Sequence, residues 1–260
     1  MALGPIKGIK QYTTAQGGSP GLHPETPFRL LLCAGSNRGK TSSIVNLVTD
    51  PKFYAQTFNR VFLVSPSLGI DDSLHPILAH QKKLGQDPDE DSIDRWDDQW
   101  LKEKISDHRR VVEYQKRELK QTKLWSCLFI LDDVASGEAG VSLRGSPVLA
   151  DIFTKSRHCC VSVIVSLHRY KVAPPIVRLS ATDLCIWATS QASQRKAILD
   201  EISGLLPSQE LVEELFYKST SVPFGHLWVA ITERDKDKVF HPGGLGTPAV
   251  PIEDIVQGNY

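Results

Sequence analysis

The chain has 260 residues, and its 30 Lys and Arg residues are balanced by 30 Asp and Glu residues. This length accommodates one large α/β domain with a sizeable core. The balanced charge excludes the global basic field that is typical of many nucleic-acid-binding proteins, so any contact with DNA must be local.

The apolar residues also exclude several classes of protein. No run of about eighteen apolar residues occurs, and the N-terminal segment has no apolar signal core, which predicts a soluble protein without membrane insertion. The five cysteines lie in or beside apolar runs and have neither metal-ligand spacing nor a disulfide framework. We therefore expect small core residues in a reducing, intracellular compartment. They are Cys33, Cys127, Cys159, Cys160 and Cys185.

The first predicted unit is an irregular lead-in over residues 1–26, which is rich in Gly, Pro, Thr and Gln and has no period. A folded domain over residues 27–234 follows. It begins with an apolar run from Leu30 to Cys33, a turn of small residues, and a helical pattern that ends near Val48. This order predicts a strand, a phosphate-binding loop and a helix.

The chemistry of anions explains that order, because a turn with little side-chain bulk lets backbone N–H groups face a polyphosphate, and the helix adds its positive end. Lys40 would reach the outer phosphates, and the Thr41 hydroxyl would ligate Mg²⁺. Alanine replaces the usual first glycine of the motif, a mild departure. A turn that merely begins a helix is the alternative. The residues predicted to cradle the phosphates are Ala34, Gly35, Ser36, Asn37, Arg38, Gly39, Lys40, Thr41 and Ser42.

A second buried strand is predicted from Val61 to Val64, and a charged segment over residues 81–123 follows it. Seven acids and one base lie between Asp87 and Asp98, whereas residues 102–123 hold eight bases and four acids. We expect one or two inserted amphipathic helices, with a face of Trp96, Trp100, Leu101, Ile105, Val111 or Val112, Gln115 and Leu119. The basic residues would either contact a DNA backbone or form a solvated face. They are Arg109, Arg110, Lys116, Arg117, Lys120 and Lys123.

The next apolar run, from Leu124 to Leu131, ends in two acids. Carboxylates at the edge of an apolar core are costly unless they meet a cation. A Walker B site explains the pair: Asp132 would hold Mg²⁺, and Asp133 would orient and polarise the water that attacks the γ-phosphate. A turn capped by aspartate is the alternative. The predicted phosphate loop favours the Walker B interpretation, because the two motifs occur together.

A Gly- and Ser-rich stretch leads to a predicted helix over residues 149–155 and to another buried strand over residues 161–166, which ends near His168. Ligands of parallel α/β sheets bind at the carboxyl ends of strands, so His168 could contact a γ-phosphate or the attacking water. A structural histidine is the alternative. Arg178 follows Pro174-Pro175, where it could act on a neighbouring subunit's nucleotide as an arginine finger or be a surface residue.

The last elements predicted are a strand over residues 182–188, a helical region over 191–218 and a strand over 225–232. Proline and glycine punctuate residues 235–260, which predicts an extended C-terminal tail. The elements together predict an α/β P-loop NTPase with a mostly parallel central sheet that carries an additional strand and is flanked by helices.

Three motifs narrow this prediction to a family. The chain has Leu131-Asp132-Asp133-Val134, then Arg157-His158 directly before a Val-Ser-Val-Ile strand, then Pro174-Pro175-Ile176-Val177-Arg178. This combination resembles the DNA-packaging ATPases of poxviruses and other large DNA viruses, which belong to the FtsK/HerA superfamily. The resemblance covers roughly residues 28–190, and its later half is more specific than the phosphate loop.

The resemblance implies a motor that hydrolyses ATP, with Mg²⁺, to translocate double-stranded DNA into a preformed capsid. It implies a homo-oligomeric ring of five or six subunits, a capsid or portal partner, and action in the virion or at the site of viral assembly. Lys40 and Thr41 would bind phosphate and Mg²⁺, Asp132 and Asp133 would form the Walker B pair, and Arg178 would be the family's arginine. His168 lies near the position at which members of this family usually have a sensor glutamine.

Other classes of function remain open at this point. A small-molecule kinase would use the same loop, but we identify neither an arginine-rich lid nor an acceptor-binding carboxylate. A regulatory NTPase would share the sites without stimulation by DNA. A degenerate scaffold would have lost hydrolysis, which the intact Lys40, Thr41, Asp132 and Asp133 argue against.

Overall fold

The structure is a computed structural model that describes residues 12–14, 24–134 and 145–260. Most of the predicted lead-in and most of the Gly- and Ser-rich stretch after Asp133 lie outside these residues. Within the lead-in, β1 (Thr13–Thr14) pairs in parallel with β5 (Lys123–Leu124) in a small separate sheet.

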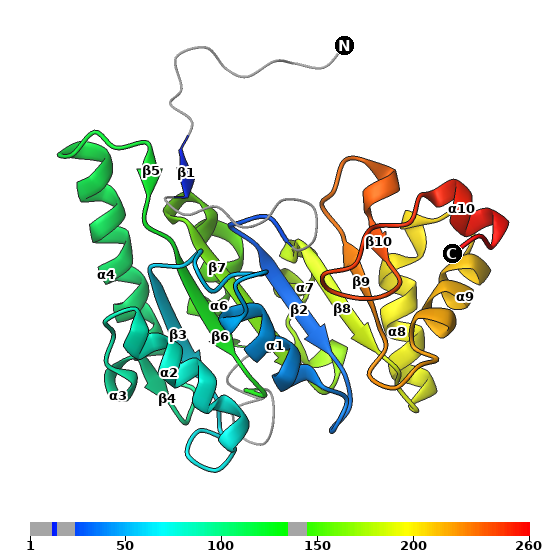
Figure 1. Ribbon diagram of the computed structural model, residues 1–260, viewed down its shortest axis with the longest axis horizontal. Coiled ribbons are helices and arrows are strands. Elements are labelled where there is room, and N and C mark those ends of the chain that lie inside the picture. The colour runs from blue at the N-terminus through cyan, green and yellow to red at the C-terminus, as the bar shows by residue number, and fades with distance from the viewer. Residues whose placement is uncertain (1–11, 15–23, 135–144) are drawn as a thin grey trace.

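The central sheet of the described residues has eight strands in the order β10-β9-β8-β2-β7-β6-β3-β4 (Figure 1). Neighbouring strands are parallel from β8 to β4, and only β9 pairs antiparallel with its neighbours. The predicted mostly parallel sheet is therefore confirmed. The strands are β2 (Arg29–Cys33), β3 (Arg60–Val64), β4 (Ser92–Ile93), β6 (Cys127–Leu131), β7 (Val161–Leu167), β8 (Asp183–Trp187), β9 (His226–Ala230) and β10 (Phe240–His241).

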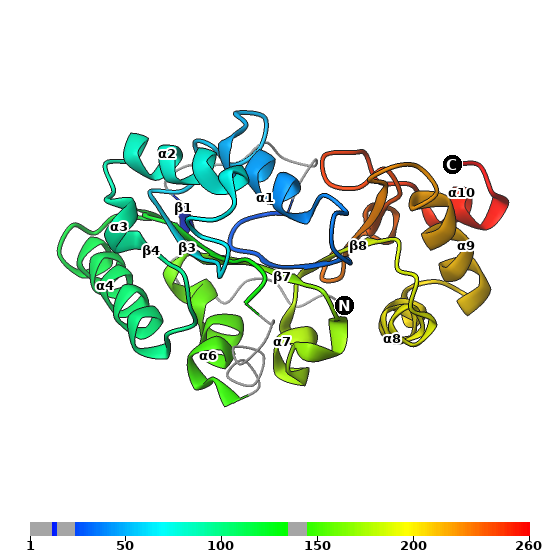
Figure 2. The same ribbon diagram turned by 90° about the horizontal axis from the view of Figure 1, so that it is seen from below.

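Helices cover both faces of this sheet (Figure 2). In that view α1 and α2 lie above the sheet, and α6, α7 and α8 lie below it. The helices are α1 (Lys40–Thr49), α2 (His75–Lys83), α3 (Pro88–Asp91), α4 (Asp98–Arg117), α6 (Pro147–Lys155), α7 (Pro175–Ser180), α8 (Ala192–Ile202), α9 (Gln209–Ser219) and α10 (Ile252–Gln257). Short 3₁₀ turns occupy Asp72–Leu74, Ser156–Cys159, Tyr170–Val172, Ser203–Leu205 and Lys236–Lys238.

The alternation of side chains in β2 explains the two layers. Successive residues of a strand point to opposite faces. Leu30 and Leu32 accordingly join the core that includes Ile44 of α1, whereas Leu31 and Cys33 join the larger core on the other face. Because both faces are covered, the central strands are buried and mostly apolar, as is typical of parallel sheets, with Ser162 and Ser166 of β7 among the buried polar exceptions.

The charged segment 81–123 contains the short helix α3, the short edge strand β4 and one long helix, α4. The predicted face of α4 packs as expected at Leu101, Val112 and Gln115, but Leu119 lies beyond the helix and is exposed. The strand β4 and the buried His108 were not predicted.

The acids of this segment have structural roles. The Asp97 carboxylate accepts the N–H groups of Gln99 and Trp100 at the start of α4, and Asp87 accepts that of Asp89 at the start of α3. Such caps satisfy donors that have no partner within the helix.

The C-terminal residues 235–260 differ from the extended tail that the sequence predicted. They add β10 to the edge of the sheet and then form α10. Aromatic stacking explains β10, because the His241 ring lies 3.7 Å from the Trp228 ring of β9, measured between centroids. Ile255 of α10 is buried against the main core. No helix among the described residues is long and apolar enough to cross a membrane.

Candidate nucleotide-binding site

The candidate site lies where three neighbouring strands end. The additional strand β7 pairs with β2 on one side and β6 on the other, and its register places Cys33 beside Leu167 and Leu131 beside Val165. The phosphate loop, the acids after β6 and His168 after β7 therefore meet at one edge of the sheet. This is the edge at which parallel α/β sheets bind ligands.

The phosphate loop has the backbone that its sequence predicted. Gly39 has a φ angle of 90° at the start of α1, a left-handed conformation that favours glycine. Ala34 has no positive φ angle, and its side chain is buried in the core beside α1. Alanine at the usual first glycine position is therefore compatible with the loop.

The Lys40 ammonium group lies at the centre of the site and is largely buried. It lies 2.7 Å from the carbonyl oxygen of Ala34, 3.2 Å from that of Gly35 and 3.2 Å from His168 Nδ1. Burial lowers the pKa of Lys40, and the carboxylates of Asp133 and Asp132 act in the opposite direction. Three acceptors thus match the three donors of the ammonium group.

The two acids after β6 occupy different environments. Asp132 is 4% exposed, and its Oδ1 accepts a hydrogen bond of 2.5 Å from Ser166 Oγ of β7. Burial raises the pKa of Asp132, and the bond from Ser166 counteracts this rise. The backbone N–H of Asp133 donates to the same Ser166 hydroxyl at 2.9 Å, so one serine positions both acids.

Asp133 and His168 form a pair that faces the loop. His168 Nε2 lies 2.9 Å from Asp133 Oδ1, and both side chains are about one-third exposed. Because Lys40 donates to Nδ1, the neutral imidazole carries its proton on Nε2 and donates it to Asp133. Asp133, His168 and Lys40 are therefore linked in a continuous chain of polar contacts, which the sequence did not predict.

The donor set of this pocket suits a magnesium ion. Mg²⁺ prefers carboxylate, hydroxyl and water oxygens. Thr41 and Asp132 both line the pocket, and the buried Asp132 carboxylate lies beside the hydroxyl groups of Ser65 and Ser166. The predicted ligands Thr41 and Asp132 thus lie in one cavity. The complete lining is Gly35, Ser36, Asn37, Arg38, Gly39, Lys40, Thr41, Ser42, Ser67, Asp71, Asp132, Asp133 and His168.

Sequence reasoning missed the part of this pocket that follows β3. Ser67 and Asp71 line it, and the charge of Asp71 contributes to the raised pKa of Asp132. Ser65 Oγ lies 3.5 Å from Asp132 Oδ2. The polar run Ser65-Pro66-Ser67 directly after the strand was the available signal, because β3 ends at the same edge of the sheet as β6.

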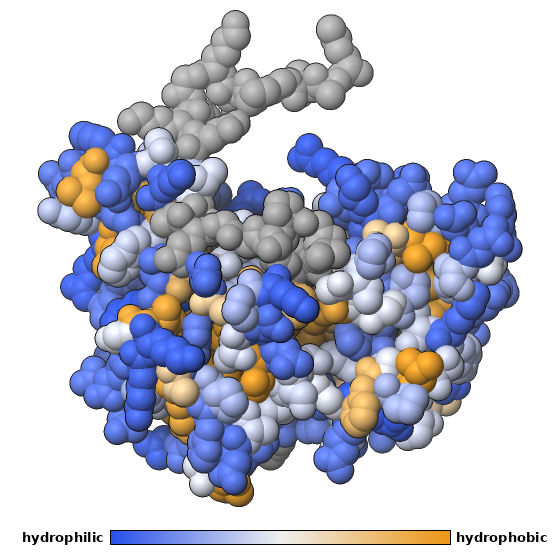
Figure 3. All heavy atoms as spheres, in the orientation of Figure 1, coloured by the Kyte–Doolittle hydropathy of each residue, from blue (hydrophilic) through white to orange (hydrophobic). Residues whose placement is uncertain are grey.

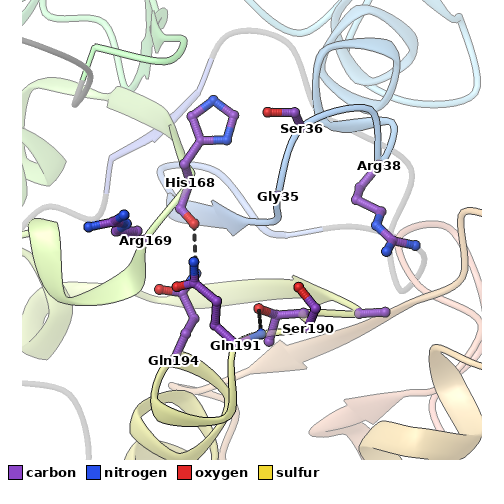
Figure 4. Close-up of a pocket in the computed structure, with 10 residues that line it drawn as sticks. Gly35, Ser36, Arg38, His168, Arg169, Ser190, Gln191 and Gln194 are labelled. Atoms are coloured by element: carbon purple, nitrogen blue, oxygen red, sulfur yellow. Dashed lines mark hydrogen bonds between the residues drawn. The ribbon is translucent and has the colours of Figure 1, made fainter.

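A second pocket lies on the other side of His168, where β8 ends and α8 begins (Figure 4). The His168 ring points toward the phosphate loop, whereas its carbonyl oxygen accepts a 2.6 Å hydrogen bond from Gln194 Nε2 of α8. Gln194 was also missed, since nothing in the sequence of α8 indicates contact with a residue 26 positions earlier.

A comparison with models of protein families identifies the family of this chain. The model of the family described as "Poxvirus A32 protein" matches residues 22–213, about three quarters of the chain. The chain belongs to the poxvirus A32 protein family. The resemblance to poxvirus proteins that the sequence motifs predicted is confirmed. No curated protein matches this A32-family chain significantly.

Solved structures support the fold of this A32-family chain. The genome packaging NTPase B204 from Sulfolobus turreted icosahedral virus 2, solved with ATP-γ-S, is 16% identical with a TM-score of 0.50; 85% of this chain and 97% of B204 are covered. The pCW3 conjugation coupling protein TcpA is 10% identical with a TM-score of 0.58, and EssC from Geobacillus thermodenitrificans is 12% identical with a TM-score of 0.54. The TcpA match covers 97% of this chain and 75% of TcpA, and the EssC match covers 99% and 50%.

Arg178 is the predicted site residue that the structure does not bring to the pocket. Its guanidinium group lies 2.7 Å from the Glu201 carboxylate of α8 and 5.4 Å from the centre of the Tyr170 ring. Among the described residues that line the two pockets, Arg178 does not occur. Its role as an arginine finger of the A32-family chain therefore stays a prediction.

Most of the basic segment over residues 102–123 lies on α4, at the left of the view in Figure 1. Lys116 donates to the carbonyl oxygen of His158 and lies over the Tyr12 ring, and Arg110 pairs with Asp107. Two residues of the predicted basic face, Arg110 and Lys116, thus form contacts within the chain. Arg109, Arg117, Lys120 and Lys123 are exposed.

Proposed function

We propose that this chain is an ATP-hydrolysing motor that translocates double-stranded DNA into a preformed capsid and works as a homo-oligomeric ring. The observation that carries the proposal is the contact chain from Asp133 through His168 to Lys40, built on three adjacent strand ends in a member of the A32 family. The likeness to B204, a genome packaging NTPase that was solved with several nucleotides, supports the choice of a packaging function.

The phosphates of ATP would occupy the loop over residues 34–42. Its backbone N–H groups and the start of α1 provide a positive site for an anion. Lys40 now donates to the carbonyl oxygens of Ala34 and Gly35. A charged phosphate oxygen is a stronger acceptor than a carbonyl oxygen, so nucleotide binding would redirect the ammonium group from the loop to the outer phosphates.

Thr41 and Asp132 would hold Mg²⁺ beside these phosphates. The ion, when bound, neutralises charge on the phosphate oxygens. The protein's own contribution is to keep Asp132 in place, which Ser166 does through its 2.5 Å hydrogen bond.

Asp133 would orient and polarise the water that attacks the γ-phosphate. The proton on His168 Nε2 fixes one oxygen of the Asp133 carboxylate and leaves the second oxygen for water. His168 thereby acts as a positioning residue in the place where the family has its sensor glutamine.

The same histidine offers a route from nucleotide to movement. Its ring contacts Lys40 and Asp133, and its carbonyl oxygen accepts from Gln194 of α8. A shift of Lys40 toward the phosphates would remove its contact with the His168 ring. The end of β7, where Gln194 donates to the His168 carbonyl oxygen, would then change position. We infer that α8 responds to the nucleotide in this way.

The ring arrangement assigns Arg178 a role between subunits, as an arginine finger at a neighbouring nucleotide. An arginine supplied in this way accelerates hydrolysis on the order of a thousandfold or more. Arg178→Ala should therefore reduce turnover by about that factor without weakening ATP binding. Glu201→Gln is the matched control, because it removes the ion pair within the chain and keeps the arginine. Normal turnover in Arg178→Ala would remove the finger role.

Double-stranded DNA would pass through the ring, and the exposed bases of residues 102–123 are our candidates for phosphate contacts. A ring of five or six subunits and a capsid or portal partner complete the proposal, with the virion or the site of viral assembly as the place of action.

The test is the steady-state ATPase rate with and without linear double-stranded DNA, at low salt and over a range of protein concentrations. Low salt is needed because phosphate contacts weaken steeply as ions are added. We expect DNA to stimulate turnover, with a cooperative dependence on protein concentration that reports assembly.

Lys40→Ala serves as the negative control, since it removes the cation at the phosphates and should abolish turnover under all conditions. An ATPase rate that DNA does not change at any protein concentration would contradict the proposed motor function and would favour a kinase or a regulatory NTPase. Turnover that survives in Lys40→Ala would contradict the site itself.

A further inference from the structure

An exposed aromatic side chain lies against the phosphate loop. The loop over residues 220–225, which joins α9 to β9, carries Val222, which is 60% exposed, and Phe224, which is 68% exposed. Figure 3 shows hydrophobic side chains at the lower right, over this loop. A Cβ atom built on Gly39 would lie 3.4 Å from Phe224 Cδ1, so the ring adjoins the glycine at which α1 begins.

The backbone presents this ring in an uncommon conformation. Phe224 has a φ angle of 62°, in the left-handed region that bulky residues rarely adopt. Such residues persist where the surroundings hold them, and they concentrate at ligand sites. Here the N–H of Gly225 donates to the carbonyl oxygen of Val222 at 2.9 Å and closes the turn.

His226, the first residue of β9, anchors the loop from the other side. Its Nε2 accepts the N–H of Leu245 at 3.0 Å, which leaves the Nδ1 proton for the carbonyl oxygen of Phe224 at 3.2 Å. Burial lowers the pKa of His226, and the hydrogen bond to Phe224 acts in the opposite direction. The His226 ring also stacks on Trp187 of β8 with 4.4 Å between centroids. The Phe224 backbone is therefore tied to the sheet and to the C-terminal residues.

We propose that Phe224 is the stacking face for the base of the nucleotide whose phosphates occupy the loop; this inference rests on the proposed function. The outer phosphates belong at Lys40, Asp133 and His168, in a pocket with polar and acidic walls that suit metal and water. Those walls offer no flat apolar face to a base. Phe224 offers one beside Gly39, at the edge of the same loop.

Stacking on an aromatic side chain accounts for the exposure of Phe224. An aromatic ring and a base interact through their faces, and removal of the ring typically weakens binding by roughly 5- to 100-fold for each base. The contact involves the base and leaves the phosphates untouched. A ligand that has the phosphates but lacks the base should therefore be indifferent to Phe224.

The experiment compares the binding of MgATP and of magnesium tripolyphosphate, by isothermal titration, to the full chain and to three variants. Phe224→Ala removes the ring, Phe224→Tyr keeps an aromatic face, and Leu179→Ala removes another exposed apolar side chain that lies on α7. Circular dichroism and sedimentation confirm the fold and the oligomeric state of each variant.

We expect Phe224→Ala to weaken MgATP binding by about 5- to 100-fold while tripolyphosphate binding changes less than about twofold. Phe224→Tyr should restore MgATP binding, and Leu179→Ala should resemble the parent chain. Equal losses for both ligands, or no loss for either, would overturn the inference alone. An altered oligomeric state with unchanged MgATP affinity would make Phe224 a subunit contact and would also overturn it. A parent chain that binds neither ligand would overturn the proposed function together with this inference.

Discussion

The two sides of the phosphate loop are built on different principles. On one side, Asp132, Asp133 and His168 lie at the ends of adjacent parallel strands and Lys40 lies at the start of α1, and hydrogen bonds hold their polar groups in place. On the other side, Phe224 is an exposed apolar ring on a loop, and its backbone carbonyl contacts His226, which the distant residues Trp187 and Leu245 hold in place.

This difference separates two tasks. Phosphate chemistry needs charges at set distances, which the ends of a parallel sheet provide directly. A flat ring beside the loop needs only support from behind, and the C-terminal residues provide that support through Leu245 and His226. Substitutions on the first side should therefore affect hydrolysis, and those on the second side should affect binding and stability.

Among the substitutions that test this difference, the largest effect should come from Asp133→Asn. The amide keeps the size of the side chain and an oxygen that can accept from His168 Nε2, but it no longer provides a carboxylate to polarise water. We expect turnover to fall by roughly 10²- to 10⁴-fold with ATP still bound. Single-turnover hydrolysis and equilibrium binding of ATP measure the two quantities. A comparable loss of binding and of turnover would show that Asp133 belongs to the binding surface instead.

A smaller effect should follow from His168→Ala, because the histidine only positions Asp133 and Lys40. We expect turnover to fall by about 10- to 100-fold, the usual cost of losing a partner that orients a site residue. The matched variant is His168→Gln, which can donate to Asp133 and should recover most of the rate. Rescue by glutamine would support its equivalence to the family's sensor residue; its failure would count against that equivalence.

Gly244→Ala would test the support behind Phe224. A Cβ at this position would lie 2.1 Å from His226 Nε2, and Gly244 has a φ angle of 89°. We expect the free energy of unfolding to fall by about 1–3 kcal/mol, measured by denaturant titration, together with weaker ATP binding. Gly258→Ala is the control, since its φ angle is 75° but no atom lies within 4 Å of the added carbon. Equal effects of the two substitutions would show that only the backbone conformation matters.

The smallest effect should come from Ala34→Gly, which restores the usual first glycine of the phosphate loop. Ala34 is buried and needs no left-handed backbone. We expect a loss of about 0.5–1 kcal/mol in the free energy of unfolding, because glycine loses more conformational freedom on folding. ATP affinity should stay within about twofold. A large gain in affinity would mean that the methyl group of Ala34 obstructs the phosphates.

The sequence by itself determined the elements in which local order carries the information. The apolar run, small-residue turn and Lys40-Thr41 predicted the phosphate loop, because a motif of consecutive residues has its geometry in its own backbone. In the same way, the apolar run before Asp132 predicted the strand β6 and its C-terminal end. Several continuous apolar runs, separated by helical segments, predicted the mostly parallel sheet, because strands that are buried on both faces consist mainly of apolar residues.

Tertiary structure decided what depends on contacts between distant residues. Pairing of β7 between β2 and β6 brought Ser166 to Asp132, and packing of α8 brought Gln194 to His168. The residues after 235 have the prolines and glycines of an extended tail, yet stacking of His241 on Trp228 adds them to the sheet. A hydrogen bond or a stacked ring between distant segments leaves no periodic pattern in either segment, so the fold alone determines such contacts.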